Sequence, residues 1–128
     1  MKKDICIIDD DQIYQLIIKK VVDRTGEFDS ISFYNDGIEA VEYFSLPDKI
    51  LPKLILLDIN MPQMDGWQFL DCLIKHRPGF EKETTIYIVS SSIAQSDRTK
   101  AHSYKQVSGF LSKPLSVEKL KEIAIRHR

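Results

Sequence analysis

Two groups of acidic residues carry the strongest chemical signal in this sequence. Asp9, Asp10 and Asp11 follow one short apolar run, and Asp58 follows another. Carboxylates that crowd together raise one another's pKa or recruit a cation. Because the ligands that they offer are all oxygen atoms, the pattern favours Mg²⁺ or Mn²⁺ over Zn²⁺.

A phosphate group would complete such a metal site. Mg²⁺ prefers few carboxylates, several waters and a phosphate. Lys113 could pair with the phosphate as a point charge, and the Ser90 hydroxyl could donate a hydrogen bond to it. A metal, a lysine and a hydroxyl together stabilise the charge that develops during phosphoryl transfer. In that reaction Asp58 is the carboxylate nucleophile.

Five short apolar segments are predicted to be the strands that position these residues. Continuous apolar runs are typical of parallel strands that are buried on both faces and need not alternate with polar residues. The predicted strands cover residues 5–8, 28–33, 54–57, 86–89 and 109–111. The acids, Ser90 and Lys113 all stand at or near the ends of these strands.

The segments between the strands are predicted to be helices, because their apolar residues recur at helical spacing. The first helix has Ile13, Leu16, Ile17 and Val21 as its predicted inner face and ends at Gly26. Asp11 and Asp65 are predicted to cap the first and third helices. The later helices are predicted from Ile38, Val41 and Phe44, from Phe69, Leu70, Leu73 and Ile74, from the polar segment 96–104, and from Val117, Leu120 and Ile123 after the cap Ser116.

Alternating strands and helices predict an α/β fold, with a five-stranded parallel sheet and helices on both faces. Ligands of such folds bind at the carboxyl ends of the strands, where the strand order reverses. This rule brings Asp9, Asp10, Asp58, Ser90 and Lys113 to one edge of the sheet. We therefore expect a single functional site there.

Size and composition predict one domain over residues 1–128, with 43% hydrophobic residues available for its core. The net charge of −1 argues against nucleic-acid binding driven by bulk charge. The N-terminal apolar run is too short for a signal peptide or a membrane span. Cys6 and Cys72 form no CxxC motif, so we expect buried free thiols and a cytoplasmic protein.

Four motifs in order resemble the receiver domain of bacterial two-component response regulators, in the layout of the single-domain chemotaxis regulator. They are the acidic pair after Ile8, the segment 57–66 around Asp58, the hydroxyl of Ser90, and the segment Phe-Leu-Ser-Lys-Pro at 110–114. The match covers nearly the whole chain. The resemblance implies a flavodoxin-like, doubly wound sheet with the strand order 2-1-3-4-5.

The resemblance also implies a role for each acid. Asp58 is the phosphoacceptor, and the phosphoryl donor is a phosphohistidine on a sensor histidine kinase or a histidine phosphotransfer protein. Asp10 ligates Mg²⁺ directly and Asp9 holds it largely through water, while Asp58 and the backbone carbonyl of Asn60 complete the protein ligands. Mn²⁺ could replace Mg²⁺.

For the remaining residues the resemblance implies signalling roles rather than the roles of an ordinary enzyme. Ser90 and Lys113 contact the phosphoryl group, and Phe110 changes rotamer together with the Ser90 hydroxyl as a switch. The chain then catalyses only its own phosphorylation and slow dephosphorylation. Asn60 and Ser92 are weak bases, so any hydrolysis that they assist is modest. Output is expected through protein contact, without nucleic acid or membrane, and a homodimer of the phosphorylated form stays open.

Two other functions remain as alternatives. A degenerate receiver would act as a phosphorylation-independent docking module, although every expected site residue is present here. A phosphatase of the haloacid dehalogenase type also uses an Asp nucleophile with Mg²⁺. Its Asp-x-Asp pattern requires a general acid where this chain has Asn60, which cannot transfer protons.

Overall fold

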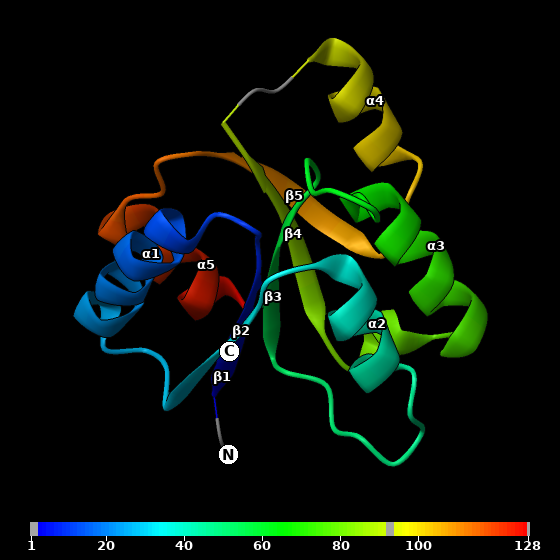
Figure 1. Cartoon of the computed structure of the whole chain (residues 1–128). Coiled ribbons are helices and arrows are strands. Elements are labelled where there is room, and N and C mark those ends of the chain that lie inside the picture. The colour runs from blue at the N-terminus through cyan, green and yellow to red at the C-terminus, as the bar shows by residue number, and fades with distance from the viewer. Residues whose placement is uncertain (1–2, 92–93, 128) are drawn as a thin grey trace.

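Strands and helices alternate along the chain in a computed structural model that describes residues 3–91 and 94–127 (Figure 1). Ser92, which the sequence suggested as a residue near the attacking water, therefore lies outside the described residues. The strands are β1 (Asp4–Ile8), β2 (Ser30–Tyr34), β3 (Leu54–Asp58), β4 (Thr85–Ser90) and β5 (Val107–Ser112). The helices are α1 (Gln12–Thr25), α2 (Gly37–Phe44), α3 (Gly66–His76), the short 3₁₀ helix η1 (Phe80–Lys82), α4 (Gln95–His102) and α5 (Val117–Arg126).

The strands form one parallel sheet in the order β2-β1-β3-β4-β5, as the sequence resemblance implied. The chain moves from β1 to β2 on one side and then crosses to β3 on the other, so the strand order reverses between β1 and β3. Ile8 lies opposite Leu57 in the register of these two strands. The residues that follow, Asp9 and Asp58, therefore leave the sheet side by side at the switch point.

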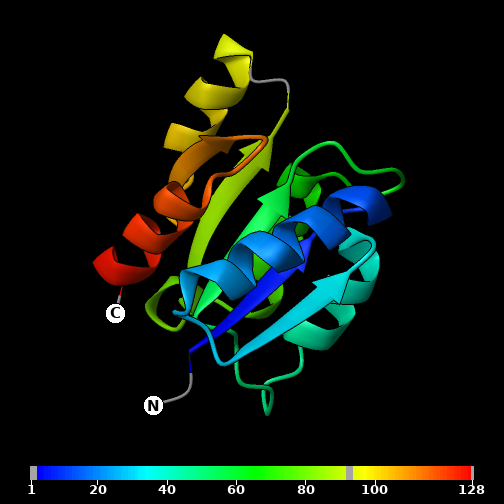
Figure 2. The same ribbon diagram turned by 90° about the vertical axis from the view of Figure 1, so that its left-hand side faces the viewer.

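Two apolar cores sandwich the sheet. Helices α1 and α5 cover one face, and α2, α3 and α4 cover the other (Figures 1 and 2). Along β1, Ile5 and Ile7 pack into the α1–α5 core, and Cys6 and Ile8 pack into the opposite core. Every residue of β3 is buried, which explains why its sequence is apolar without interruption up to Asp58.

Most helices begin at the capping residues that the sequence predicted. The Asp11 side chain accepts hydrogen bonds from two amides in the first turn of α1. Asp65 forms a capping box with Gln68 at the start of α3, and Ser116 caps α5. Asp11 as a cap confirms the register in which Asp9 and Asp10 precede the helix. These caps fix where each helix starts relative to the strand that comes before it.

The inner face predicted for α1 is wrong except at Val21, which is partly buried against the α1–α5 core. Ile13, Leu16 and Ile17 are 72%, 67% and 50% exposed. The helix instead buries a second stripe, made of Tyr14, Ile18, Val22 and Thr25. Both stripes have helical spacing, so periodicity alone could not choose between them. On α2, Ile38 is also exposed rather than inward, because Ala40 and Phe44 make the contact with the core.

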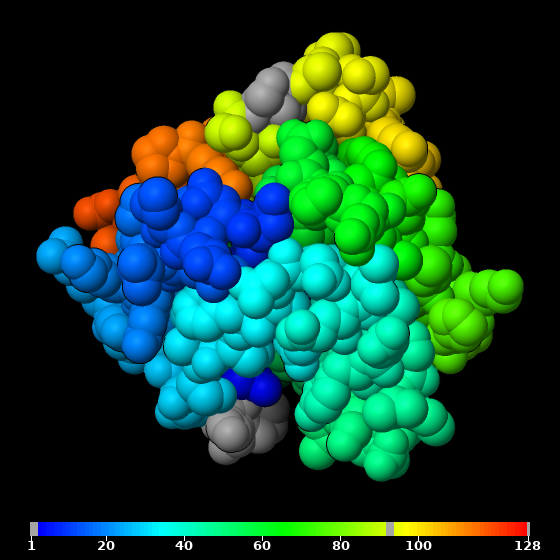
Figure 3. Space-filling view, in the orientation of Figure 1, coloured from blue at the N-terminus to red at the C-terminus, as the bar shows by residue number. Residues whose placement is uncertain are grey.

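Helix α4 is attached to the rest of the fold more sparingly than the other helices. It spans Gln95–His102, slightly shorter than the predicted 96–104, and only Ala101 of the helix is buried. Its first turn has no side-chain cap. Figure 3 shows α4 at the periphery of the molecule, beside the segment that joins β3 to α3. Within the described residues, no helix is both long enough and apolar enough to cross a membrane.

Candidate functional site

Four strands deliver polar residues to the carboxyl edge of the sheet. Asp9 follows β1, Asp58 ends β3, Ser90 ends β4, and Lys113 follows β5. Asp9, Asp58 and Ser90 are buried, which is unusual for polar groups unless they are paired. The sequence predicted this gathering from the rule that the sites of parallel sheets lie at the carboxyl ends of the strands, and the fold brings all four residues to that edge.

Asp9 is a buried carboxylate that the local backbone holds in place. Only 2% of the residue is exposed. Its Oδ1 atom accepts a hydrogen bond from the Asp11 amide at 2.9 Å. The Asp9 amide donates to the Tyr34 carbonyl of β2 at 3.1 Å, and the Gln15 side chain donates to the Asp9 carbonyl at 2.8 Å. The other carboxylate oxygen, Oδ2, faces the Lys113 ammonium at 2.7 Å.

Asp58 carries the strongest electrostatic perturbation at this edge. Burial, and after it the charge of Asp9, raise the pKa of the Asp58 carboxyl to about 6. The Asn60 amide, which donates to Asp58 Oδ1 at 3.2 Å, and Lys113 both oppose this rise in pKa. A carboxylate with a raised pKa in a cleft is a common sign of a functional group.

Lys113 supplies the positive charge of the site. Its Nζ atom lies 2.7 Å from Asp9 Oδ2 and 3.9 Å from Asp58 Oδ2. The Lys113 amide donates to the Ser90 carbonyl at 3.0 Å, so the backbone of β4 holds the lysine at this position. The Lys113–Pro114 peptide bond is cis. One ammonium therefore serves two buried carboxylates, which leaves net negative charge at this edge of the sheet.

The acids fit a hard divalent cation. One carboxylate oxygen from each of Asp9, Asp10 and Asp58 lies within 4.8 Å of the other two. Opposite ligands of a single Mg²⁺ ion are separated by about 4.2 Å, so small side-chain adjustments bring these oxygens to a common ion. Asp10 is exposed, and it can therefore meet an ion from the solvent side. The donor set suits Mg²⁺ or Mn²⁺ rather than Zn²⁺.

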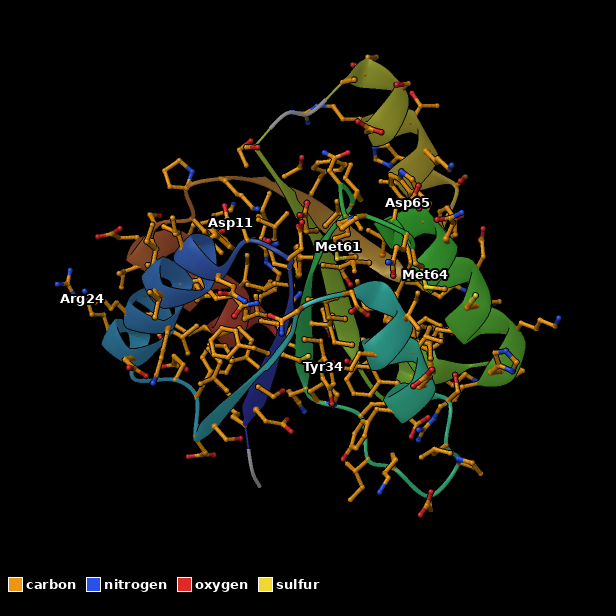
Figure 4. All side chains as sticks on the ribbon, in the orientation of Figure 1. Asp11, Arg24, Tyr34, Met61, Met64 and Asp65 are labelled. Atoms are coloured by element: carbon orange, nitrogen blue, oxygen red, sulfur yellow. The ribbon has the colours of Figure 1, made fainter. Side chains whose placement is uncertain are left out.

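The segment between Asp58 and α3 is packed tightly against the end of β3. The Gly66 amide donates to the Ile59 carbonyl at 3.1 Å. A Cβ atom on Gly66 would lie 2.8 Å from the Asp58 carbonyl oxygen, so only glycine fits there. Figure 4 shows Met61 in this segment and Asp65 at the start of α3. The position of α3 is therefore tied directly to the backbone of Asp58.

Ser90 and Phe110 lie on adjacent strands. Ser90 is buried, whereas Phe110 is half-buried in β5. Phe110 lies opposite Ile88, two positions before Ser90, so the ring is set back from the edge of the sheet. The Arg98 guanidinium of α4 lies 5.8 Å from the centroid of the Phe110 ring. Phe110 is thus placed between the site and α4.

Two residues of the site were missed by the reading of the sequence. The Tyr14 ring lies under Lys113, with 4.2 Å between Nζ and the ring centroid. Gln15 bridges the Asp9 carbonyl and the Asn35 side chain at 2.8 and 2.9 Å. Tyr14 was missed because the other stripe of α1 was taken as its inner face. The signal that could have identified Tyr14 as a residue of the site was its position in the first turn of the helix, just after the cap Asp11.

Comparison with protein-family models gives one match, the response regulator receiver domain, over residues 5–125. Among characterised proteins, the transcriptional regulatory protein DegU of Brevibacillus brevis is 32% identical over 122 residues, which is 94% of this chain. The aligned region spans 48% of the length of DegU.

Solved structures give the same result for the fold. A two-component response regulator from Cytophaga hutchinsonii has a TM-score of 0.86 and 27% identity, with 98% of this chain and 97% of that chain covered. The receiver domain of a sensor histidine kinase from Pseudomonas aeruginosa has a TM-score of 0.77 and 21% identity, with 99% and 98% covered. That structure has a magnesium ion coordinated in its active site cleft.

Proposed function

This chain belongs to the response regulator receiver family, and from that premise we propose that Asp58 accepts a phosphoryl group in a Mg²⁺-dependent reaction. The donor is a phosphohistidine on a sensor histidine kinase or a histidine phosphotransfer protein. The whole chain, 1–128, acts as one receiver domain in the cytoplasm. A receiver domain is a signalling module, and its only chemistry is its own phosphorylation and dephosphorylation.

The observation that carries this proposal is the convergence of three carboxylates and one lysine at the strand-order switch point. Oxygens of Asp9, Asp10 and Asp58 lie within 4.8 Å of one another, and Lys113 lies 2.7 Å from Asp9. Such a cluster is costly for the fold unless a cation neutralises it. Mg²⁺ does so, and it binds through few carboxylates and keeps positions that a phosphoryl oxygen can take.

Four groups would hold the ion. Asp10 and Asp58 would ligate it directly, Asp9 would hold it largely through water, and the backbone carbonyl of Asn60 would add a further oxygen. When bound, Mg²⁺ supplies positive charge to the oxygens of the phosphoryl group that is transferred. The magnesium seen in the related Pseudomonas receiver domain supports this assignment.

In the transfer, a carboxylate oxygen of Asp58 forms a bond to the phosphorus atom. The bond between phosphorus and the histidine nitrogen breaks, and its electron pair stays with the imidazole, which takes up a proton from solvent. Asp58 must be ionised to attack, and above its pKa of about 6 it is. The product is an acyl phosphate on Asp58.

Lys113 and Ser90 stabilise the transferred group. The Lys113 ammonium lies 3.9 Å from Asp58 Oδ2, so a small movement away from Asp9 brings it to a phosphoryl oxygen. The Ser90 hydroxyl donates to a second phosphoryl oxygen. Movement of Ser90 towards that oxygen frees space for Phe110, and Phe110 passes the change to the surface formed by α4 and β5. A downstream protein reads that surface, and dimerisation of the phosphorylated chain is one form that the output can take.

The donor protein docks on α1. Ile13, Leu16 and Ile17 are exposed on this helix, within two turns of the cap residue Asp11 and therefore beside the acidic cluster. A contiguous exposed apolar stripe of this kind marks a protein contact surface. Its place at the rim of the cleft suits a partner that must deliver a phosphohistidine to Asp58 and then leave.

The first test is intact-mass spectrometry after incubation with Mg²⁺ and acetyl phosphate. We expect one phosphate adduct on the wild-type chain, none in EDTA, and none on Asp58→Asn with Mg²⁺. The Asn side chain is close in shape to Asp but is not a nucleophile, so it is the matched control.

Each contrary result selects a different alternative. A folded chain that binds Mg²⁺ but takes no phosphate would be a degenerate receiver that works by docking alone. An adduct that persists on Asp58→Asn would mean that another residue is the nucleophile. Continuous release of phosphate from many small phosphoesters, without a stable adduct, would favour a phosphatase of the haloacid dehalogenase type.

A further inference from the structure

Tyr14 is a buried aromatic residue at the centre of the site. It lies in the first turn of α1, three residues after the cap Asp11, and it is 8% exposed. Its ring faces the Lys113 ammonium at 4.2 Å. Burial raises the pKa of the Tyr14 phenol, and the charges of Asp9 and Asp58 add to the rise.

Three groups surround the Lys113 ammonium in the described residues. Asp9 approaches at 2.7 Å, Asp58 at 3.9 Å, and the Tyr14 ring closes another side. The two carboxylates attract the ammonium strongly, and Asp9 would by itself draw the ammonium away from the reacting oxygen. The ring attracts a cation through its quadrupole and neutralises none of its charge. A lysine held by a ring therefore keeps its full charge for an incoming phosphoryl group.

The ring, rather than the hydroxyl, is the part of Tyr14 that makes a polar contact here. The Tyr14 hydroxyl is buried, and no hydrogen-bond partner for it exists among the described residues. A tyrosine selected for its hydroxyl would normally have a partner, because buried polar groups are nearly always paired. The ring, in contrast, both joins the α1–α5 core and touches the lysine.

We propose that Tyr14 is a positioning residue for phosphoryl transfer, and that the face of its ring holds the Lys113 ammonium where it meets the phosphoryl group. This inference rests on the proposed function of Lys113. It adds a residue from α1 to the groups that would contact the phosphoryl group or the ion, which otherwise stand at or just beyond strand ends. Because Tyr14 and the exposed stripe of α1 share one helix, the same element would serve both the donor protein and the lysine.

The test compares Tyr14→Leu, which removes the ring, with Tyr14→Phe, which keeps it. The rate of Asp58 phosphorylation by acetyl phosphate is measured at saturating Mg²⁺. We expect Tyr14→Leu to be about tenfold slower than wild type and Tyr14→Phe to stay within about twofold of wild type. Phe80→Leu is the matched control, because it removes a fully buried ring from η1, away from the strand ends that form the site.

A double-mutant cycle separates positioning from general damage to the fold. In a Lys113→Met background, Tyr14→Leu should slow the reaction no further, because the group that the ring positions is already absent. An equal loss in both backgrounds would overturn the proposal, as would an unchanged rate in Tyr14→Leu. A slow Tyr14→Phe variant would also overturn it, since the hydroxyl would then be the functional group.

A readout that needs no phosphorylation makes the two hypotheses distinguishable. The side-chain ε-CH₂ protons of Lys113 should be shifted upfield by the ring current in wild type and Tyr14→Phe, and should return to ordinary values in Tyr14→Leu. Absence of that shift in wild type would overturn the role of Tyr14 on its own. A chain that shows the shift but takes no phosphate on Asp58 would instead remove the proposed function, and with it the catalytic meaning of the contact.

Discussion

Helices α1 and α4 flank the acidic cluster on opposite faces of the sheet, and they are built differently. Helix α1 is capped by Asp11, buries one apolar stripe and exposes another. Helix α4 has no side-chain cap and buries only Ala101. The first helix is therefore a fixed platform beside the site, whereas little free energy holds the second in one position.

Besides the buried Ala101 and the contact of Arg98 with Phe110 of β5, an aromatic contact just beyond α4 ties this helix to α3. Tyr104, just beyond α4, stacks on Trp67 with 5.5 Å between ring centroids, and its hydroxyl donates to Asp71 at 2.7 Å. Lys100 of α4 lies 5.3 Å from the centroid of the Trp67 ring. Since Trp67 directly follows Gly66, this contact connects α4 to the backbone next to Asp58. A switch needs such an element, which has few contacts and a short path to the site.

The prediction with the largest expected effect concerns α1, which we propose as a fixed docking surface for the donor protein. Ile17→Glu should slow phosphotransfer from a histidine kinase that phosphorylates the wild-type chain by about 10- to 100-fold, because a charge would be buried in the interface. Phosphorylation by acetyl phosphate should not change, and stability should shift by no more than about 0.5 kcal/mol. Phosphotransfer and intact mass are measured on the same preparation.

Ile125→Glu is the matched control for that experiment. Ile125 is also an exposed isoleucine on a helix, but it lies near the far end of α5. We expect this variant to accept the phosphoryl group from the kinase at the wild-type rate. Equal losses in the two variants would mean that general surface charge, and not docking on α1, controls the transfer.

The same helix shows where prediction from sequence succeeds and fails. The acidic register and the caps Asp11 and Asp65 followed from local patterns, and the parallel sheet followed from the alternation of strands and helices, whereas the strand order came from the family resemblance. The buried stripe of α1 did not, because both stripes are apolar at the same period. Which stripe turns inward depends on how the loop after β1 enters the helix, and that is a tertiary property.

Contacts among the site side chains could be anticipated only in part. Strand ends bring Asp9, Asp58 and Lys113 to one edge in any fold of this class, so their meeting was predictable. The contact of Tyr14 with Lys113 depends on which side of α1 faces the sheet. The stack of Trp67 on Tyr104 joins segments that are distant in sequence. No periodic signal encodes such pairs, since each depends on packing between elements.

The next prediction has a smaller expected effect. It tests whether electrostatic repulsion that destabilises the fold is concentrated in the acidic cluster between α1 and α4. The pKa of Asp58 is raised to about 6 in the folded protein, so the folded state binds a proton more tightly than the unfolded state. The ionised Asp58 carboxylate therefore lowers the unfolding free energy by its full amount above pH 6, and this loss of stability disappears as the pH falls towards 4. In EDTA at pH 7.5, Asp58→Asn should exceed wild type in unfolding free energy by about 1–3 kcal/mol.

Urea unfolding at pH 7.5 and pH 5 measures this difference. The gap between Asp58→Asn and wild type should narrow at pH 5, whereas Asp48→Asn, on an exposed loop acid, should match wild type at both values. Added Mg²⁺ should stabilise wild type more than Asp58→Asn, because the ion binds the folded acidic cluster. Equal stability of wild type and Asp58→Asn at pH 7.5 would place the destabilising repulsion outside the cluster.

The smallest effect on overall stability concerns the attachment of α4. Tyr104→Leu removes both the stack on Trp67 and the hydrogen bond to Asp71, whereas Tyr104→Phe removes only the hydrogen bond. We expect global unfolding to change by less than about 1 kcal/mol in either variant, because the Tyr104 side chain is only partly buried.

Amide exchange should nevertheless quicken about 3- to 10-fold within Gln95–His102 in Tyr104→Leu, and less in Tyr104→Phe, with α1 unchanged. Hydrogen exchange followed by mass spectrometry measures both helices in one sample. If the amides of α4 exchange as slowly without the Tyr104 ring as with it, then β5 and not α3 holds the helix in place. In that case the path through Gly66 and Trp67 does not couple Asp58 to α4. If exchange quickens equally in α1, the two helices belong to one cooperative unit, and the difference between platform and movable element disappears.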